Sequence, residues 1–162
     1  MSAKSVEDRL EVLAVAAKYF ASVDARDWTT HRSFYMDKVV TQFDVQADTA
    51  DLDTIQGKEV DADQAVEATK HTIGNISVTQ HTMTNAYVEG EGDELTLRFY
   101  EEALHHHPSL GSAPEVNTWT MYGRVVQVYR RTPNGWKLRE ARITPVHDVG
   151  NRDLLTAAAA GK

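Results

Sequence analysis

The first part of the chain carries an apolar stripe with a helical period. Apolar residues recur there at steps of three and four, at Val6, Leu10, Leu13, Ala14, Ala17, Phe20 and Val23. This spacing predicts an amphipathic helix. A second, short helix is expected from about Asp27, with Trp28 and Tyr35 two turns apart, and Asp27 stands where a capping residue would.

Two more short elements and an acidic stretch follow. Lys38–Phe43 is rich in β-branched side chains and predicts a short strand. Asp61 with Gln64 matches a capping box, and we expect the helix that it starts to end at about Thr72. Residues 44–63 hold seven acids against one lysine. We interpret them as a solvated loop, because their spacing lacks the glycine and closing glutamate of a calcium-binding loop.

Beyond Thr72 the hydrophobic period changes from 3.6 to 2, which is typical of strands. The four long candidates are Ser77–Glu89, Glu94–His107, Val116–Arg131 and Trp136–His147. The tripeptide 133–135, Pro-Asn-Gly, is a strong hairpin signal and favours an antiparallel meander. Helices followed by a run of strands indicate an α+β fold. We expect a curved antiparallel sheet wrapped over the N-terminal helices, with a pocket between the two layers.

Length and composition agree with one globular domain. The chain has 162 residues, and we expect a single domain over residues 1–150 with a helical or disordered tail over 151–162. It has no cysteine, which excludes a disulfide framework, a thiolate zinc site, an iron–sulfur cluster and a cysteine nucleophile. No Gly-rich phosphate loop, GxSxG elbow or HExxH motif occurs, so nucleotide binding and the serine hydrolase and zinc protease classes have no support.

Charge narrows the choice of partners. The net charge of −7 and the absence of a basic cluster argue against a nucleic acid or an anionic membrane as partner. The N-terminal sequence MSAKSVEDRL has no apolar core of a signal peptide, and the longest apolar runs are only a few residues. We therefore expect a cytoplasmic protein.

Strand alternation sorts the candidate functional residues by face. His81, Met83 and Asn85 share one face of the first long strand. His81 has two interpretations: a hydrogen-bonded core histidine, or an acid–base group, since an imidazole can take and return a proton near neutral pH. On the last strand, Arg142 is in phase with Trp136 and is expected to point inward. It would then pair with Glu140 or with a bound anionic group.

Three consecutive histidines, His105, His106 and His107, resemble a metal cluster at first sight. Neighbours on a strand point to opposite faces, so all three cannot reach one ion. We expect no metal, and we expect His105 to be the inward residue because it shares a face with Phe99.

Two further candidates lie at the end of the first helix. Asp24 follows the apolar stripe, and Tyr19 precedes it by five residues, which separates the two by roughly 140° around a helix. Both reach one pocket only if that pocket wraps around the helix end. Asp24 is otherwise a residue of the terminal turn or a cap for the next helix.

Three segments together resemble the SnoaL-like branch of the NTF2-like superfamily. They are KYFASVDARDW, VTQHTMTNAYVEGEGDELTLRFY and MYGRVVQVYRRTPNGWKLREARI, and the resemblance covers about residues 5–145. It implies a cone-shaped α+β barrel and a homodimer or homotrimer. The scytalone dehydratase and bile-acid dehydratase type of site is the most similar: Tyr19, Asp24 and His81 stand at matching positions, and His105 matches a second histidine.

The same resemblance implies substrate contacts. Arg142 matches an arginine of the bile-acid dehydratases, but those enzymes have an aspartate where this chain has Ala103. We expect substrate contacts from five residues, which are Arg142, Asn85, Trp119, Phe99 and Met83. The epoxide hydrolases of the superfamily use an Asp-Arg-Asp trio, of which Asp24 and Arg142 could supply two members.

The implied function is a cofactor-free acid–base lyase or isomerase that acts on a hydrophobic cyclic metabolite. His81 would take a proton from carbon next to a carbonyl, Asp24 would orient His81 or His105, and Tyr19 would hydrogen-bond the carbonyl oxygen. A non-catalytic small-molecule carrier, an epoxide hydrolase or cyclase using the same pocket, and a scaffold that uses the outer sheet face are the alternatives.

Overall fold

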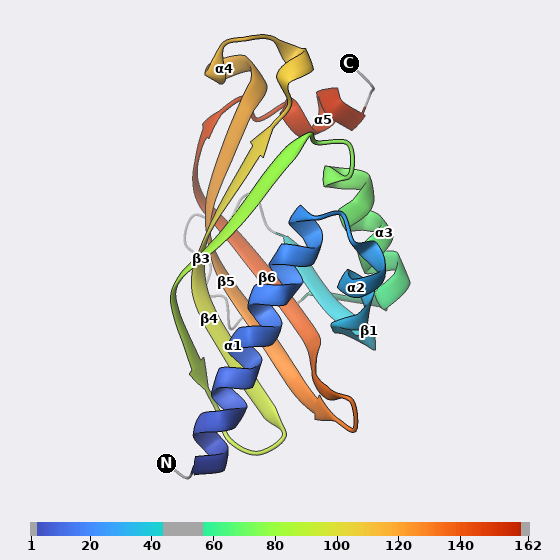
Figure 1. The fold of residues 1–162 in the computed structure, drawn as a ribbon, viewed down its shortest axis with the longest axis vertical. Helices are drawn as coiled ribbons and strands as arrows, with labels where there is room; N and C mark the ends of the chain where they lie inside the picture. Colours follow the sequence, from blue (N-terminus) through green and yellow to red (C-terminus); the bar gives the residue numbers. More distant parts are fainter. Residues whose placement is uncertain (1–2, 44–56, 160–162) are drawn as a thin grey trace.

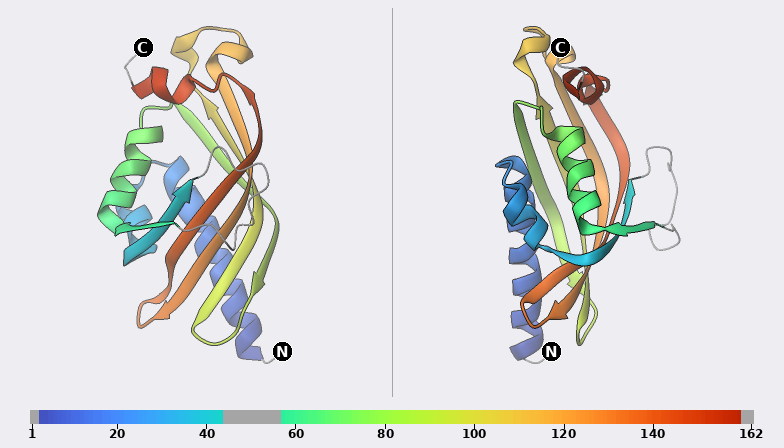
Figure 2. Two further views of the ribbon diagram at one scale, coloured as in Figure 1. Left: turned by 180° about the vertical axis from the view of Figure 1, so that it is seen from behind. Right: turned by 90° about the vertical axis from the view of Figure 1, so that its right-hand side faces the viewer.

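The computed structural model of the chain describes residues 3–43 and 57–159. In chain order the elements are α1 (Ala3–Asp24), α2 (Trp28–Ser33), β1 (Tyr35–Phe43), β2 (Lys58–Asp61), α3 (Ala62–Ile73), β3 (Val78–Glu89), β4 (Glu94–His106), the 3-10 helix η1 (Pro108–Leu110), α4 (Pro114–Asn117), β5 (Thr118–Thr132), β6 (Gly135–Gly150) and α5 (Leu154–Ala159). Helices α1, α2 and α3 lie on one face of a long, curved sheet (Figures 1 and 2). The predicted α+β class is confirmed.

The described strands form one sheet in the order β2-β1-β6-β5-β4-β3. Strands β3 to β6 make the predicted antiparallel meander, whereas β1 pairs with β6 in parallel. In the described ranges the sheet has two edges, β2 and β3, and does not close on itself. The cone expected from the resemblance is therefore an unclosed curved sheet, completed on its concave side by helices.

Two irregularities in this sheet decide which side chains face the helices. In β3 the register shifts between Thr84 and Tyr87, and Asn85 has a φ of 51°. In β6, Leu138 and Glu140 pair with consecutive residues of β5, so Arg139 is an extra residue. Each extra residue is a β-bulge, which reverses the in-and-out alternation of the strand beyond it.

The main core lies between α1 and the concave face of the sheet. Val12, Ala16 and Phe20 of α1 pack into one buried cluster with Leu97, Phe99, Val125, Tyr129, Trp136 and Leu138 of the sheet. A second cluster joins Val23 and Ile73 to Trp119, Met121 and Leu154 at the other end. The predicted helix is confirmed, but the face predicted for it is largely wrong: of the predicted stripe only Phe20 and Val23 are buried, whereas Val6, Leu10, Ala14 and Ala17 are exposed.

Some boundaries differ from the sequence prediction. The backbone N–H of Thr30 donates to the Asp27 carboxylate at 3.0 Å, which confirms Asp27 as the cap of α2. The helix ends at Ser33, however, and Tyr35 begins strand β1, so Tyr35 is not a residue of the second helix. The predicted acidic loop lies mostly outside the described residues, and its last part forms β2 and the start of α3.

The C-terminal helix α5 packs against the body of the protein. Leu154 is fully buried and Ala158 is 3% exposed, both in the second core cluster. In Figure 1 this helix lies beside the end of α3. Residues 160–162 of the predicted tail lie outside the described ranges. Over residues 3–43 and 57–159, no helix combines the length and apolar character of a membrane span.

If α5 belongs to the core, replacing its buried leucine will destabilise the whole domain. Leu154→Ala removes a fully buried side chain and is expected to lower the free energy of unfolding by about 2–5 kcal/mol. The measurement is equilibrium unfolding in urea. Thr156→Ala, an exposed position of the same helix, is the control and should stay within about 0.5 kcal/mol of wild type. Equal stability of the two variants would mean that α5 is not docked.

Candidate active site

A cavity of about 400 Å³ lies between the helices and the concave face of the sheet. Its wall is mostly apolar, with Phe20, Val23, Ile73, Trp119 and Ile143 among the lining residues. Its titratable side chains are Tyr19 on α1, Tyr35 on β1, His81 on β3, and Glu101 and His105 on β4, and Thr41, Gln42, Thr69 and Thr72 add uncharged polar groups. Leu155 of α5 also lines the cavity. Such an apolar hollow with a few convergent polar groups is typical of a small-molecule site.

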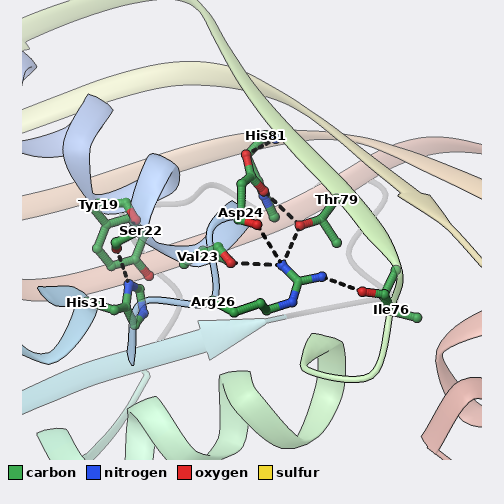
Figure 3. Close-up of polar contacts among 9 residues, drawn as sticks. All are labelled: Tyr19, Ser22, Val23, Asp24, Arg26, His31, Ile76, Thr79 and His81. Carbon is green, nitrogen blue, oxygen red and sulfur yellow. Dashed lines mark hydrogen bonds and ion pairs between the residues drawn. The ribbon is translucent and has the colours of Figure 1, made fainter. Parts of the chain in front are cut away.

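Asp24 and His81 are in direct contact at the edge of this cavity (Figure 3). Nδ1 of His81 is 2.7 Å from Oδ1 of Asp24, and the backbone N–H of His81 donates to Oδ2 at 3.0 Å. Asp24 is the last residue of α1, and His81 is the fourth residue of β3. The His81 ring also stacks on Phe20, with 5.5 Å between centroids. The ring is therefore held by both a carboxylate and an aromatic face.

Neighbouring donors keep the Asp24 carboxyl ionised. The Thr79 hydroxyl donates to Oδ1 at 2.8 Å and in turn accepts from Arg26 at 2.7 Å. Burial opposes ionisation of Asp24, but the hydrogen bonds from His81 and Thr79 outweigh it and hold its pKa below the ordinary value. Arg26, at a φ of 59°, also donates to the Ile76 carbonyl, and so fastens the end of α1 to the segment before β3 (Figure 3).

This arrangement fixes the tautomer of His81. An ionised carboxylate only accepts hydrogen bonds, so Nδ1 must carry the proton that points at Asp24. In the neutral ring Nε2 then has a free lone pair, and no described residue hydrogen-bonds it. The His81 side chain is 11% exposed and lines the cavity. The pair resembles the base and orienting carboxylate of many acid–base sites.

Two more polar side chains line the cavity from β4, Glu101 and His105, and each is 4% exposed. Oε2 of Glu101 and Nδ1 of His105 have no hydrogen-bond partner in the described residues. Burial raises the pKa of Glu101 and lowers the pKa of His105 to about 4. The His105 ring stacks on Trp119 at 4.9 Å and meets His81 edge-on at 5.9 Å. His106 and His107 instead contact Thr118 and Ser77.

A chain of four hydrogen bonds links the Tyr19 hydroxyl, at the cavity, to the buried His31 and from there back to the Tyr19 carbonyl. The hydroxyls of Tyr19 and Tyr35 are 2.9 Å apart, and Tyr35 is 3.1 Å from Nε2 of His31. Nδ1 of His31 is 3.1 Å from the Ser22 hydroxyl, which donates to the Tyr19 carbonyl at 2.6 Å. His31 is fully buried, and burial lowers its pKa to about 4, so its ring is neutral at neutral pH.

The direction of this chain follows from counting protons. The single proton of Ser22 goes to the Tyr19 carbonyl, so Ser22 accepts from Nδ1–H of His31. Nε2 of neutral His31 is then an acceptor, and Tyr35 donates to it. The Tyr35 oxygen therefore accepts the proton of Tyr19. At rest, Tyr19 offers lone pairs rather than its proton to the cavity.

Of the five residues expected from the sequence to contact a substrate, only Trp119 lines the cavity. Phe99 is 3% exposed in the main core, and Met83 packs against that core. Neither belongs to the cavity lining, which includes His81 from β3 and Glu101, Ala103 and His105 from β4.

Asn85 is exposed and does not line the cavity. Alternation places it on the face of His81, but the bulge in β3 interrupts that alternation. Beyond it Ala86 and Val88 pack on the core, and Tyr87 is 53% exposed. The face predicted for Asn85 is therefore wrong.

Arg142 is also absent from the cavity lining. The bulge at Arg139 shifts the inward face of β6 to Ala141 and Ile143, which do line the cavity. Arg142 forms an ion pair with Glu140, one of the two partners expected for it. The inward orientation predicted for Arg142 is wrong, and no Asp24–Arg142 pair forms.

Sequence inspection did not single out Glu101, His31, Tyr35 or Leu155. For Glu101 a signal was present, since it alternates in phase with Phe99, Ala103 and His105. His31 carries no such signal, because its role depends on the contact between α1 and the loop that follows it. Over the described ranges, no three His, Asp or Glu side chains are grouped to hold a metal ion.

The chain matches a known domain family and shares its fold with solved structures. The family model of the SnoaL-like domain matches residues 4–142. No curated protein sequence matches it significantly. The Kfla4162 protein from Kribbella flavida has a similar structure, with a TM-score of 0.78 and 22% identity over 93% of this chain and 97% of that one.

Two further solved structures share the fold. A "putative dehydratase from the NTF2-like family" of Streptomyces avermitilis has a TM-score of 0.70 and 18% identity, over 88% of this chain and 98% of its own. A "putative scytalone dehydratase" of Novosphingobium aromaticivorans has a TM-score of 0.67 and 12% identity, over 86% and 89%. At these identities the likeness establishes the fold alone.

The buried His105 ring predicts a specific pH dependence of stability. Its folded pKa of about 4 lies below the ordinary value of 6.5, so its contribution is complete above pH 6.5 and is lost as the pH falls toward 4. His105→Phe keeps the stack on Trp119 and removes this titration. Between pH 6.5 and 4, the variant should lose less unfolding free energy than wild type, by on the order of 3 kcal/mol.

Urea unfolding at several pH values measures this difference. His31 titrates in the same window and remains in both proteins, so only the difference between them is informative. His71→Gln, on the exposed end of α3, is the control and should reproduce the wild-type profile. Parallel profiles for wild type and His105→Phe would contradict the assignment of a neutral, buried His105.

Proposed function

Because the chain belongs to the family of SnoaL-like domains, we propose that it is a cofactor-free acid–base enzyme. It would be a dehydratase-type lyase or an isomerase acting on a hydrophobic cyclic metabolite. The family includes dehydratases and isomerases, so membership alone does not select the reaction. The observation that carries the proposal is the Asp24–His81 pair at the wall of an apolar cavity.

His81 is the base in this proposal. Its Nε2 lone pair takes a proton from a carbon next to a carbonyl, and the developing imidazolium is stabilised by Asp24 through Nδ1–H. Asp24 also fixes the tautomer, as the carboxylate of a Ser-His-Asp triad does for its histidine. The aromatic and aliphatic wall, including Trp119 and Ile143, binds the ring of the substrate and excludes water.

Tyr19 and His105 are the proposed polar contacts of the substrate. Tyr19 accepts a hydrogen bond from a substrate hydroxyl at rest, and it can donate to a carbonyl oxygen only after its O–H turns away from Tyr35. His105 is neutral at neutral pH and presents its unpaired Nδ1 beside His81. Its proposed role is to bind and orient a substrate oxygen rather than to supply a positive charge.

The geometry gives less support to the other functions considered. An epoxide hydrolase trio would need Arg142 beside Asp24, but Arg142 pairs with Glu140 away from the cavity lining. A non-catalytic carrier needs only the apolar cavity. It does not account for a carboxylate that accepts three hydrogen bonds in order to hold one imidazole toward the ligand space.

A general carbon-acid probe tests the base directly. 5-Nitrobenzisoxazole loses its ring C–H proton to a base, its N–O bond breaks, and a coloured phenolate forms. We expect wild type to catalyse this elimination and His81→Asn to lower kcat/KM at least about 100-fold. The asparagine amide can still donate to Asp24, so the variant removes the basic Nε2 while keeping the helix–strand contact.

The control and the opposing outcomes are defined by the same assay. His71→Asn, at an exposed histidine, should leave kcat/KM unchanged. Asp24→Asn should also lower kcat/KM, since an uncharged partner no longer stabilises the imidazolium. Wild-type turnover no faster than that of free imidazole, with the probe bound in the cavity, would contradict the proposal and favour a carrier.

A further inference from the structure

Glu101 is the one acidic side chain in the lining of the described cavity. It lies on β4 and is 4% exposed. Its Oε2 is buried without a hydrogen-bond partner, and no described cation forms an ion pair with it. Buried polar groups in proteins are nearly always paired. A buried, unpaired carboxyl group that borders a cavity is therefore placed to meet a ligand.

The same burial determines the protonation state of Glu101. An unpaired carboxylate is very costly in an apolar interior, and such a group takes up a proton instead. Burial raises the pKa of Glu101, and the nearby Asp24 carboxylate raises it further, against an opposing effect of His81. Burial and the missing partner thus favour the protonated carboxylic acid over the carboxylate at Glu101.

The Glu101 carboxyl does not donate a hydrogen bond to another described group, whereas the Tyr19 hydroxyl does. The Tyr19 proton is used in the chain that runs through Tyr35 to His31. The neutral ring of His105, whose pKa is about 4, is a poor source of a proton at neutral pH. Among the described side chains around the cavity, Glu101 is the best placed proton donor.

The strand register places Glu101 diagonally across from the base. His81 is opposite Ala103, and Glu101 precedes Ala103 by two residues on the same face of β4. Diagonal neighbours of this kind have Cβ atoms about 7–8 Å apart. Ala103, which lies opposite His81 and next to Glu101 on this face, also lines the cavity. A substrate can therefore contact Nε2 of His81 and the Glu101 carboxyl at the same time.

We propose that Glu101 is the general acid of the site and that the substrate is a hydroxy-carbonyl compound that loses water. His81 takes the proton from carbon, and the C–H electron pair becomes the new C=C bond. The C–O bond breaks, and the departing hydroxyl takes the proton of Glu101 and leaves as water. His81 is then an imidazolium and Glu101 a carboxylate, and proton transfer from the first to the second restores both.

This inference rests on the proposed function and specifies its reaction and substrate class. It is tested with two carbon-acid probes that differ in their leaving oxygen: 5-nitrobenzisoxazole, which releases a stable phenolate, and unsubstituted benzisoxazole, which releases a more basic one. An acid that supplies a proton matters more as the leaving oxygen becomes more basic.

Three variants isolate the contribution of Glu101. Glu101→Leu removes the donor, Glu101→Gln keeps an N–H donor without an acidic proton, and Glu102→Gln, on the opposite face of β4, is the matched control. For benzisoxazole we expect Glu101→Leu to lower kcat/KM about 100-fold, with Glu101→Gln intermediate. For 5-nitrobenzisoxazole both losses should be several times smaller, and Glu102→Gln should match wild type for both probes.

The outcomes separate this inference from the proposed function. Turnover that depends on His81 but is the same in Glu101→Leu as in wild type for both probes would overturn the role of Glu101 and leave the base in place. Absence of any His81-dependent turnover would overturn the proposed function and this inference with it.

An unfolding measurement supplies a second readout that needs no turnover. Because Glu101 has no partner to lose, Glu101→Leu should unfold at a higher urea concentration than wild type. A lower midpoint would mean that the carboxyl is held by a structural contact, and this too would overturn the role assigned to it.

Discussion

The carboxylate of Asp24 joins the end of α1 to the start of β3, and the site is built on this contact. β3 is an edge of the described sheet, so backbone N–H groups on its outer side need partners other than a strand. Asp24 accepts one of them, from His81, together with the side chains of His81 and Thr79. The Asp24 carboxylate, which accepts a hydrogen bond from the backbone at the strand edge, therefore also orients the His81 imidazole. The Asp24 carboxylate thus links the position of the end of α1 to the orientation of the His81 ring.

The polar groups around the cavity fall into two kinds. Tyr19, Tyr35, His31 and Ser22 form a chain in which each donor has an acceptor, and such a chain is rigid and has one direction. Oε2 of Glu101, Nδ1 of His105 and Oε1 of Gln42 belong to residues that line the cavity and are buried without a partner in the described residues. Unpaired buried groups reduce stability, so several of them around one cavity, beside a fully satisfied network, favour ligand binding as their role.

Local patterns in the sequence predict the elements well, and they predict side-chain direction only up to the first bulge. The helical spacing from Val6 to Val23 and the four alternating segments became α1 and β3 to β6, because hydrophobic period reports the type of element. It does not give the buried face of α1, where Val6 and Leu10 are exposed and Val12 and Ala16 are buried. Alternation also places His81 and His105 on the concave side correctly, because both lie in the part of β3 and β4 that pairs without a register shift. It misplaces Asn85 and Arg142, because one inserted residue reverses every later position of the strand. Nothing local marks an extra residue at Arg139. The contact between His31 and Ser22 could not be predicted either, because it depends on how the chain turns after α1.

Proteins with this fold catalyse many different reactions. In this chain, the protonation states of the groups around the cavity limit which reactions the site could catalyse. Asp24 is ionised, while burial keeps His31 and His105 neutral at neutral pH and raises the pKa of Glu101. The Asp24 carboxylate disfavours a negative charge on Glu101. Once His81 gains a proton, its charge lowers the pKa of Glu101, and the acid becomes readier to release its own proton. The proposed base and the proposed acid are thus coupled through their charges. Such coupling suits the elimination that we propose, in which one proton is removed as another is delivered.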